Sequence, residues 1–277
     1  MNLRIVAVNA ADDATISASP AAQSDLLEIN LQTAKRGEVC RVLGTSCTFD
    51  VELPSGRTIG CVALVRHNFS PTAKWQIRFY SDAQLGGALV YDTGLVYIDS
   101  PIAWGSFSWG DGPWARNRYS GWPQPCAIVW PSRISARSLS IAISDPDNAD
   151  GFLQAARLFV GDYLSPATNV SWGVKLTWKD DSEQVRTDGG SLIGDARETY
   201  RQIVMSCDWL TDDERAQFSE LARIAGKSRD VLLSVYPQNA DPNKERDYQF
   251  AAKYSDTPDM VSPFFGYHAH QMTFTET

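Results

Sequence analysis

Basic charge is scarce in this sequence and is spread along the chain. There are 25 Lys and Arg against 33 Asp and Glu, a formal net charge of −8, with no dense run of basic residues. Proteins that grip a nucleic acid backbone do so with clustered Lys and Arg, so we expect no specific nucleic-acid binding. An acidic surface could still line a channel through which DNA slides without sticking.

Metal-binding spacings are missing too. The 5 cysteines form no CxxC pair, and with the 3 histidines they match no zinc pattern. We therefore predict no metal and no cofactor. Cys61 and Cys207 fall inside apparent strands and are interpreted as small buried hydrophobic residues. Cys40 and Cys47 are spaced so that they could bridge a short loop, although nothing in the sequence requires it.

Long apolar runs are absent as well. No stretch approaches the ~20 residues that a helix needs to cross a bilayer, which predicts no membrane span. The run Met1–Asn9 is short and strand-like, and Asp12 and Asp13 follow it, unlike a signal peptide. We expect synthesis in the cytoplasm.

The sequence also lacks the common catalytic motifs. It has no GxSxG elbow, P-loop, Rossmann fingerprint or HExxH motif. Carboxylates are plentiful, but a glycosidase needs two of them facing each other at roughly 5–10 Å, and the sequence singles out no such pair. We predict that the protein is not an enzyme and keep an enzyme acting on polysaccharide as a third hypothesis.

What the sequence does contain is the pattern of β-structure. Apolar and polar residues alternate over Trp75–Ser81, which predicts a strand with one buried and one wet face. The preceding run Ile59–Phe69 is apolar at nearly every position, so we expect it to be covered on both faces. Together these strands favour an antiparallel sandwich over a βαβ fold.

A first domain is predicted over residues 1–165. Short strands separated by frequent turns are typical of a sandwich. The further strands that we expect there are Leu3–Val8, Gln23–Leu31, Thr48–Leu53, Ser138–Ile143 and Phe152–Val160.

A short linker containing a proline, Leu164–Asn169, precedes a second domain at 166–277. Its first strand is Trp172–Trp178, in which alternate residues share one face. Arg201–Trp209 follows as another strand, with Ile203, Met205 and Cys207 in phase.

One amphipathic helix is predicted at about 211–225. Thr211 and Glu214 form a capping box at its start, and Gly226 ends it. Its apolar stripe falls at positions i, i+3, i+4 and i+7: Phe218, Leu221, Ala222 and Ala225. The strands expected after the helix are Asp230–Tyr236, Asp247–Tyr254 and Tyr267–Phe274.

Three stretches of the first domain, Val62–Asp82, Leu89–Gly94 and Ser138–Asp162, resemble the jelly-roll of galactose-binding-like domains. More narrowly, the chain resembles distal-tail-like proteins of the tail tip and baseplate of long-tailed bacteriophages and prophages, in which such a domain adjoins a second β-rich domain. The order of elements after residue 166 is similar to the split β-barrel with one flanking helix of tail-tube and distal-tail proteins.

This resemblance implies a structural component of the virion. A ring-forming homo-oligomer would surround the tail channel, with tail tube, tape measure and hub proteins as partners. The barrel would be built by Trp172, Trp178 and the strand Arg201–Trp209, and the first domain would project outward. The alternative is a carbohydrate-binding module that contacts host surface glycans.

Large aromatic residues crowd the segment Trp104–Trp122, between glycines and a proline that exclude a long regular element. They either stack on sugar rings while polar neighbours bond the hydroxyls, or pack under the loop or against a neighbouring subunit. We favour packing, because aromatic residues and Arg are enriched in protein interfaces. The candidate contact residues are Trp104, Trp109, Asp111, Trp114, Arg116, Arg118, Tyr119 and Trp122.

An oxygen-rich loop carries Asp145, Asp147 and Asp150. Calcium is the alternative reading of this loop, but Ala149 stands at the fifth position, where Asp or Asn would be expected. A hairpin turn explains the same residues without a metal.

The histidines are interpreted as structural. His67 follows an apolar strand with no nucleophile or acid evident beside it, so we expect a packed or hydrogen-bonded side chain. His268 and His270 alternate along the last strand and share a face. Two histidines at that spacing could chelate a metal, but no third ligand is visible, so we predict exposed strand residues.

Overall fold

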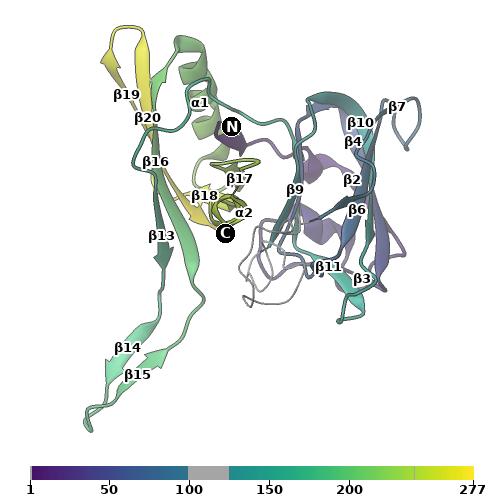
Figure 1. Ribbon diagram of the computed structural model, residues 1–277, viewed down its shortest axis with the longest axis horizontal. Helices are drawn as coiled ribbons and strands as arrows, with labels where there is room; N and C mark the ends of the chain where they lie inside the picture. Colours follow the sequence, from purple (N-terminus) through teal and green to yellow (C-terminus); the bar gives the residue numbers. More distant parts are fainter. Residues whose placement is uncertain (1, 99–124, 240) are drawn as a thin grey trace. The chain divides into compact units, whose positions relative to one another are not determined.

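The computed structural model describes residues 2–98, 125–239 and 241–277. This described part is mainly β, which confirms the predicted fold class (Figure 1). Its strands are β1 (Arg4–Val6), β2 (Thr15–Ser19), β3 (Cys40–Leu43), β4 (Ser46–Ile59), β5 (Cys61–Val65), β6 (Lys74–Tyr80), β7 (Leu89–Asp92), β8 (Val96–Tyr97), β9 (Cys126–Val129), β10 (Ile134–Ser144), β11 (Phe152–Ala155), β12 (Arg157–Gly161), β13 (Lys175–Lys179), β14 (Glu183–Arg186), β15 (Leu192–Asp195), β16 (Tyr200–Leu210), β17 (Val231–Ser234), β18 (Gln249–Tyr254), β19 (Asp259–Phe264) and β20 (Tyr267–Glu276). The helices are α1 (Asp212–Ala225), α2 (Pro242–Asp247) and the 3₁₀ turns η1 (Ala10–Asp13) and η2 (Glu28–Gln32).

The chain forms two compact units. The first contains residues 3–165 and 231–250, and the second contains 166–230 and 251–277. The main division falls inside the expected linker. Residues 231–250, which the sequence analysis placed in the second domain, group with the first unit, where β17 pairs with β1.

The first unit is an antiparallel sandwich. One layer has the strand order β2-β4-β10-β6-β7, and the other is formed by β12-β5-β9 with the pair β11-β3. Inward side chains from both layers meet in one core, for example Phe79 and Ile141 from the first layer and Leu64 and Leu158 from the second.

The alternation in β6 is the strongest local signal for this sandwich. Trp75, Ile77 and Phe79 are fully buried, while the residues between them stay at least partly accessible, as predicted. The apolar strand predicted over Ile59–Phe69 is shorter, because Ile59 ends β4 and only Cys61–Val65 forms β5. Every residue of β5 is buried, as expected for a strand covered on both faces. Burying each such large apolar side chain contributes about 1.5–3 kcal/mol, so these strands carry much of the unit's stability.

Two predicted strands of the first unit are wrong in detail. Residues 23–31 contain no strand, and their C-terminal part forms η2 instead. This segment satisfies its backbone through turns such as Asn30 N–H to the Leu27 carbonyl. The run Phe152–Val160 is two strands, because β11 pairs with β3 whereas β12 pairs with β5.

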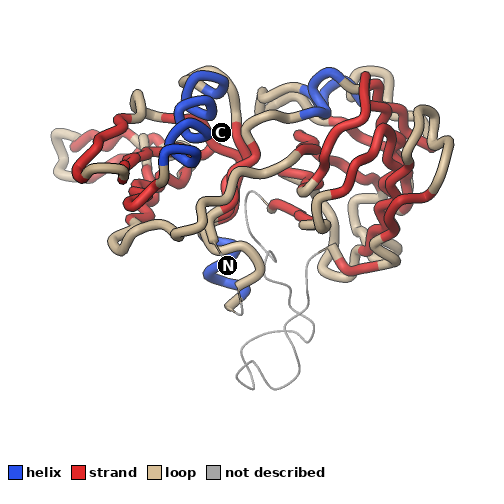
Figure 2. The backbone as a smooth tube through the Cα atoms, turned by 90° about the horizontal axis from the view of Figure 1, so that it is seen from above, coloured by secondary structure: helices blue, strands red, loops and turns tan. Residues whose placement is uncertain are grey.

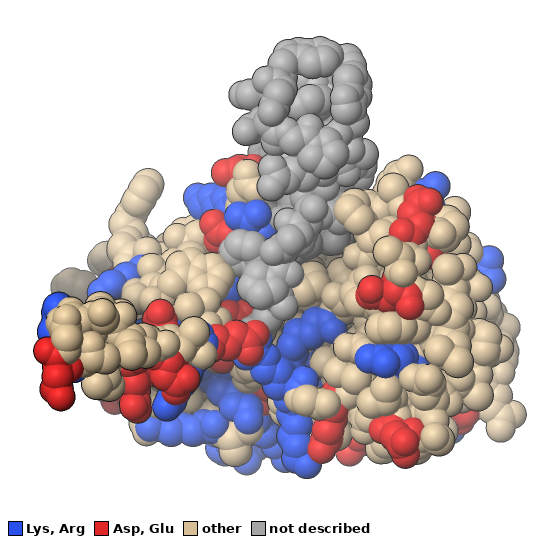
Figure 3. All heavy atoms as spheres, turned by 90° about the horizontal axis from the view of Figure 1, so that it is seen from below, with Lys and Arg blue, Asp and Glu red and all other residues tan. Residues whose placement is uncertain are grey.

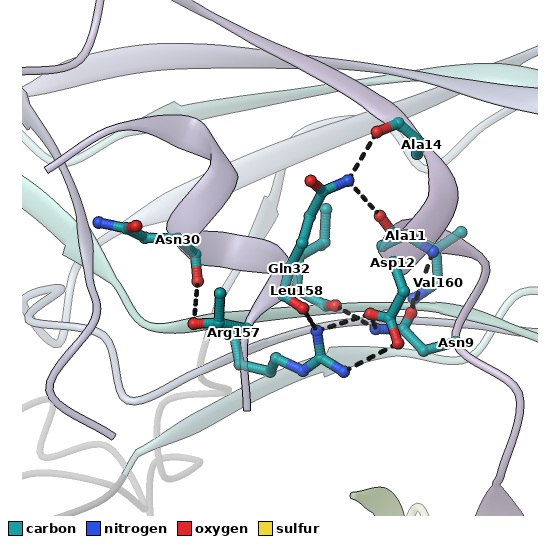
Figure 4. A network of polar contacts seen from close by, with 10 residues as sticks. Asn9, Ala11, Asp12, Ala14, Asn30, Gln32, Arg157, Leu158 and Val160 are labelled. Carbon is teal, nitrogen blue, oxygen red and sulfur yellow. Dashed lines mark hydrogen bonds and ion pairs between the residues drawn. The ribbon is translucent and has the colours of Figure 1, made fainter. Parts of the chain in front are cut away.

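A buried arginine ties the N-terminal segment to this sandwich (Figure 4). Arg157 on β12 is 2% exposed, and its Nη1 lies 2.6 Å from Oδ1 of Asp12. Gln32 donates to the carbonyl oxygens of Ala11 and Ala14 at 2.7 and 2.6 Å. Asn9 accepts from the Val160 N–H at 2.9 Å and donates to the Leu158 carbonyl at 2.8 Å. These contacts satisfy polar groups that would otherwise be buried without partners.

The second unit is built on one twisted antiparallel sheet. β16 pairs with β13 on one side and β20 on the other, and β20 pairs in turn with β19 and β18. Ile203, Met205 and Cys207 are buried on one face of β16, which confirms their predicted phase. The opposite face of β16 is only partly buried.

Helix α1 covers the buried face of this sheet (Figure 2). The predicted capping box is present, with the Thr211 side chain accepting from the Glu214 N–H and the Glu214 side chain accepting from the Thr211 N–H. Phe218 and Leu221 are buried, and the Phe218 ring lies 5.3 Å from that of His270. The cap and the apolar stripe therefore place the helix as predicted.

Of the two tryptophans proposed to build a barrel, Trp178 lies in the sheet, on β13 opposite Arg201, and Trp172 does not. Trp172 is 104% exposed relative to the reference state and lies outside β13. Trp178 is 44% exposed. The strand Arg201–Trp209 does form the centre of the sheet as predicted.

A buried ion pair lies between the ends of this sheet's central strands. Arg201 on β16 and Glu276 on β20 have side chains that are 1% and 3% exposed. The Arg201 backbone N–H and Nε both donate to Glu276 Oε2 at 2.9 Å. Because both charges are withdrawn from water, each requires the other as its partner.

Candidate functional site

The tryptophan-rich contact residues lie outside the described part of the chain. These are Trp104, Trp109, Asp111, Trp114, Arg116, Arg118, Tyr119 and Trp122. Their assignment to a sugar or to a neighbouring subunit stays a prediction.

The three aspartates considered for calcium bind separate protein donors. Asp145 is fully buried and accepts from the Ser70 N–H at 2.7 Å and from the Ser70 hydroxyl. Asp147 accepts from Thr72 at 2.7 Å, and Asp150 from Asn68 at 2.9 Å. The described residues contain no group of three or more His, Cys, Asp or Glu placed to hold a metal. These carboxylates fix the turn at residues 68–72.

His67 is a packed residue, as predicted. Its ring stacks on Phe69 with centroids 4.4 Å apart, and its Nδ1 accepts from the Phe69 N–H at 3.2 Å. Complete burial lowers the pKa of His67 to about 3, because the apolar surroundings disfavour the charged form.

The cysteines are buried free thiols. Burial raises the pKa of Cys40, Cys47 and Cys207 to about 12 in each case. Thiols of this kind carry almost no thiolate near neutral pH and are poor nucleophiles.

The prediction of exposed histidines on β20 is wrong. His270 is 1% exposed, and burial lowers its pKa. The His268 side chain is 12% exposed and bridges two other residues. Its Nδ1 lies 2.8 Å from the Ser262 hydroxyl oxygen, and its Nε2 lies 2.8 Å from Asp212 Oδ1. This face of the strand is buried because α1 covers it.

A serine, a histidine and an aspartate in a row raise the question of nucleophilic catalysis. Hydrolytic triads hold the carboxylate buried and orient the base with it. Here the Asp212 side chain is 76% exposed at the first position of α1. We interpret the three residues as a structural hydrogen-bond chain that connects β19 and β20 to the start of α1.

The most distinctive feature of the second unit is a projecting hairpin, which we call the arm: β14, β15 and the turn between them. It extends from the end of β13 and β16, away from α1 (Figure 1). Every residue in both of its strands is exposed. Val185, Leu192 and Ile193 are 65%, 56% and 59% exposed.

The arm has little internal support. Its strands pair only with each other, over four residue pairs. Glu183 and Asp195 are directly opposite, and Arg197 lies between them at 3.5 and 3.7 Å. Exposed ion pairs contribute at most about 1 kcal/mol. A two-stranded hairpin alone is only marginally stable in water.

A second uncovered surface lies at the other end of the same unit. We call it the aromatic tip: Trp209, Phe264, Phe265 and Tyr267. Trp209 and Phe264 are stacked with centroids 5.4 Å apart and planes 3° apart, and Tyr267 meets Trp209 edge-on at 5.6 Å. Phe264 is 59% exposed and Phe265 104%.

The backbone is strained where it presents this surface. Trp209 has a φ of 65°, in the left-handed region that bulky residues rarely occupy. It lies in a β-bulge, because the register of β16 against β20 shifts between Cys207 and Leu210. The bulge leaves the Trp209 ring 54% exposed against Phe264 rather than in the core.

The first unit carries an open groove of about 280 Å³ on the outer face of β2, β4 and β10. Polar side chains contribute to its lining, but more of the lining surface is apolar than polar: Thr15, Ser17, Asp50, Val51, Glu52, Gln84, Leu85 and Ser138. The loop after β6 closes one side, where the Leu85 N–H donates to the Ser138 hydroxyl at 3.1 Å. The groove therefore combines an apolar surface with a few hydrogen-bonding side chains.

On the face that Figure 3 shows, acidic and basic side chains occur on both units, so neither unit presents charge of one sign alone there. No helix in the described residues is long and apolar enough to span a membrane.

The sequence reasoning missed both surfaces of the second unit. The pair Gly189-Gly190 between two short strand-like runs was a usable hairpin signal. Pro263-Phe264-Phe265-Gly266 was another, since glycine after two aromatic residues suits a tight turn with an exposed tip.

No family model and no curated protein matches this sequence. Among solved structures, the family 32 carbohydrate-binding module of C. perfringens NanJ in complex with galactose is similar to 58% of this chain and 99% of its own, with 14% identity and a TM-score of 0.38. A chitosan-binding module from a Paenibacillus sp. IK-5 chitosanase/glucanase is similar over 55% of this chain and 98% of its own, at 11% identity and a TM-score of 0.38.

A third similar structure is CpGH89CBM32-5 from Clostridium perfringens in complex with GalNAc-β-1,3-galactose, with 11% identity, a TM-score of 0.37 and coverage of 56% of this chain and 99% of that one. Nothing in these comparisons points to a phage tail protein. Similarity of this degree does not bear on what this chain binds.

Proposed function

We propose that this chain is a structural assembly protein that works through contacts with further copies of itself. The observation that carries the proposal is the arm. Its apolar side chains are exposed on a hairpin that pairs with no other strand of the described residues. Burying them in a neighbouring molecule would supply the stabilisation that the hairpin lacks.

The finer form of the proposal is a component of a phage tail tip or baseplate. The second unit would join a ring around the tail channel, and the first unit would extend outward, toward other tail proteins or the host surface. Support comes from the element order after residue 166, in which strands, the capped helix α1, the short helix α2 and further strands follow one another. Apart from α2, this order resembles that of distal-tail proteins. A symmetric ring needs interfaces and no reacting centre.

Light scattering after size-exclusion chromatography tests this proposal. We expect the full chain to form a defined oligomer and the double variant Leu192→Glu/Ile193→Glu to be monomeric. The matched control is Ile29→Glu/Leu95→Glu, because these side chains are exposed to 59% and 62% on the first unit. A wild-type chain that stays monomeric at every concentration would contradict the proposal. Electron microscopy of the oligomer would then give the ring order.

A second candidate function is glycan binding by the first unit. The groove on β2, β4 and β10 is the observation that favours it. Asp50 and Glu52 can accept hydrogen bonds from sugar hydroxyls, and Gln84 can both donate and accept. The tryptophan-rich segment Trp104–Trp122 would supply stacking surfaces.

Calorimetric titration with galactose and with chito-oligosaccharides separates the two functions. Glycan binding predicts a measurable affinity. If the groove is the binding site, Glu52→Gln should weaken this affinity. If the tryptophan-rich segment is the binding site, Trp109→Ala or Trp114→Ala should abolish it. The oligomeric state should not change in these variants. No heat with any glycan would remove this candidate and leave the assembly proposal intact.

A further inference from the structure

The arm and the aromatic tip lie at opposite ends of one strand. β16 has 11 residues, which at about 3.3 Å each span roughly 36 Å. The arm joins β16 through residues 196–199, and Trp209 lies next to the strand's far end (Figure 1). Because a paired strand does not fold back on itself, the arm and tip of one molecule stay apart.

The two surfaces have complementary chemistry. Val185 and Ile193 are cross-strand partners and form an apolar face on the arm. Leu192 pairs with Arg186 on the opposite face. The Arg186 guanidinium donates to the Gly190 carbonyl at 3.0 Å and stays on the exposed surface. One face of the arm thus offers two aliphatic side chains, and the other offers Leu192 beside the Arg186 cation.

The aromatic tip offers the matching groups. Trp209, Phe264 and Tyr267 are about half exposed, and Phe265 is fully exposed. The Asp212 carboxylate follows Trp209 by three residues, is bound to β20 through His268 and is still 76% exposed. Aliphatic side chains pack well on aromatic faces, and an Arg beside a carboxylate and an aromatic ring gains charge-assisted and cation–π contacts.

We propose that the arm of one copy docks on the aromatic tip of the next copy. The contact rests on the assembly function proposed above and names its two surfaces. It is heterologous, because each copy contributes a different patch, and repetition of such a contact closes a ring or grows a filament. A second copy is the occupant favoured here, since both halves of the contact are present, uncovered, in one chain.

Mixing two inactive variants tests this pairing. The arm variant is Leu192→Glu/Ile193→Glu, which keeps an intact tip. The tip variant is Phe264→Glu/Phe265→Glu, which keeps an intact arm. Each alone should be monomeric, with association weakened by about thirtyfold or more, as for loss of a hot-spot residue. Their mixture should form a 1:1 dimer and nothing larger, because one contact remains and cannot be repeated.

The outcomes are distinguishable by native mass spectrometry of differently tagged chains. A wild type that assembles while the mixture stays monomeric would overturn the arm-on-tip pairing and leave the assembly function standing. A wild type that never assembles would overturn both. Association of the tip variant with itself would also overturn the pairing.

Disulfide trapping keeps the test valid if a glutamate variant does not fold. Ile193→Cys in one copy and Phe264→Cys in another should cross-link under mild oxidation. The native cysteines are buried, so the introduced thiols are the reactive ones. Ile29→Cys with Phe264→Cys is the control and should give no cross-link. Equal cross-linking in both pairs, or none in an assembled sample, would contradict the proposal.

Discussion

The two units differ in how completely they bury their own strands. In the first, two sheets face each other across one core, and β5 is buried at every position. In the second, α1 covers one face of a single sheet, and the arm has all its strand residues exposed. The first unit thus buries most of its strands between two layers, although β7 is also exposed at every position, whereas the second unit combines one covered sheet face with the exposed arm.

Both units nevertheless contain a buried arginine that is paired with a carboxylate. The arginine is Arg157 in the first unit and Arg201 in the second. Asp12, the partner of Arg157, is 44% exposed, whereas Glu276, the partner of Arg201, is 3% exposed. The ion pair of the second unit is therefore the more deeply buried of the two, so loss of one partner should destabilise that unit more.

Removing the arm gives the largest expected effect. Replacing residues 183–195 by a short glycine linker should abolish self-association, because it deletes half of the proposed contact. The unfolding of both units, followed by circular dichroism, should change little, since the arm packs against no other described strand. Retained oligomers would show that the second unit assembles through another surface.

Breaking the buried pairs comes next. Arg201→Ala should lower the free energy of unfolding by about 3–5 kcal/mol, because Glu276 is left charged and buried. Arg157→Ala should lower it by about 1–3 kcal/mol, since water can reach Asp12. Urea denaturation measures both.

The matched control for these substitutions is Arg223→Ala, which removes an exposed pair with Glu220 on α1. It should change the free energy of unfolding by less than about 1 kcal/mol. If Arg201→Ala and Arg157→Ala lowered the free energy of unfolding equally, the two ion pairs would not differ in their contribution to stability.

Acid should destabilise both units through their buried histidines. Burial lowers the pKa of His67 from 6.5 to about 3, and it also lowers that of His270. The unfolded chain therefore binds more protons than the folded one below about pH 6.5, and the free energy of unfolding falls as pH drops. Each histidine contributes a slope of up to about 1.4 kcal/mol per pH unit.

The histidine effect is measured by urea denaturation between pH 7 and pH 4. His67→Gln should flatten the acid slope by about one proton, and His270→Gln should flatten it in the same direction, whatever they do to stability at pH 7. An unchanged slope in both variants would show that other groups control acid unfolding.

The smallest effect is expected at the helix cap. Thr211→Ala removes the acceptor for the Glu214 N–H and should lower the free energy of unfolding by about 1 kcal/mol. Ser219→Ala, on the exposed side of α1, is the control and should stay within about 0.5 kcal/mol. A cap effect no larger than the control would mean that packing alone holds the helix.

Local patterns allowed part of this architecture to be predicted. The alternation through Trp75, Ile77 and Phe79 and the capping box at Thr211 each predict an element that the structure contains. The burial of His268 and His270 was missed because it depends on where α1 lies, which is tertiary information. The exposure of Trp172 was missed because alternation predicts a shared face without showing whether anything covers it.

The surfaces proposed for function were harder to predict than the core. Core residues repeat with the period of their strand, so pattern alone finds them. The arm and the aromatic tip break the pattern, because their apolar side chains stay exposed in the part of the chain that the structure describes. Whether such residues form a surface becomes visible only when the rest of the fold is known.

Hydrogen exchange at varied protein concentration tests the contrast between the units most directly. We predict that amides of the arm, residues 183–195, are protected in concentrated protein and lose protection on dilution. Amides of β10, in the first unit, should stay protected throughout and serve as the internal reference. Arm amides that exchange at one concentration-independent rate would contradict the claim that other copies cover the second unit.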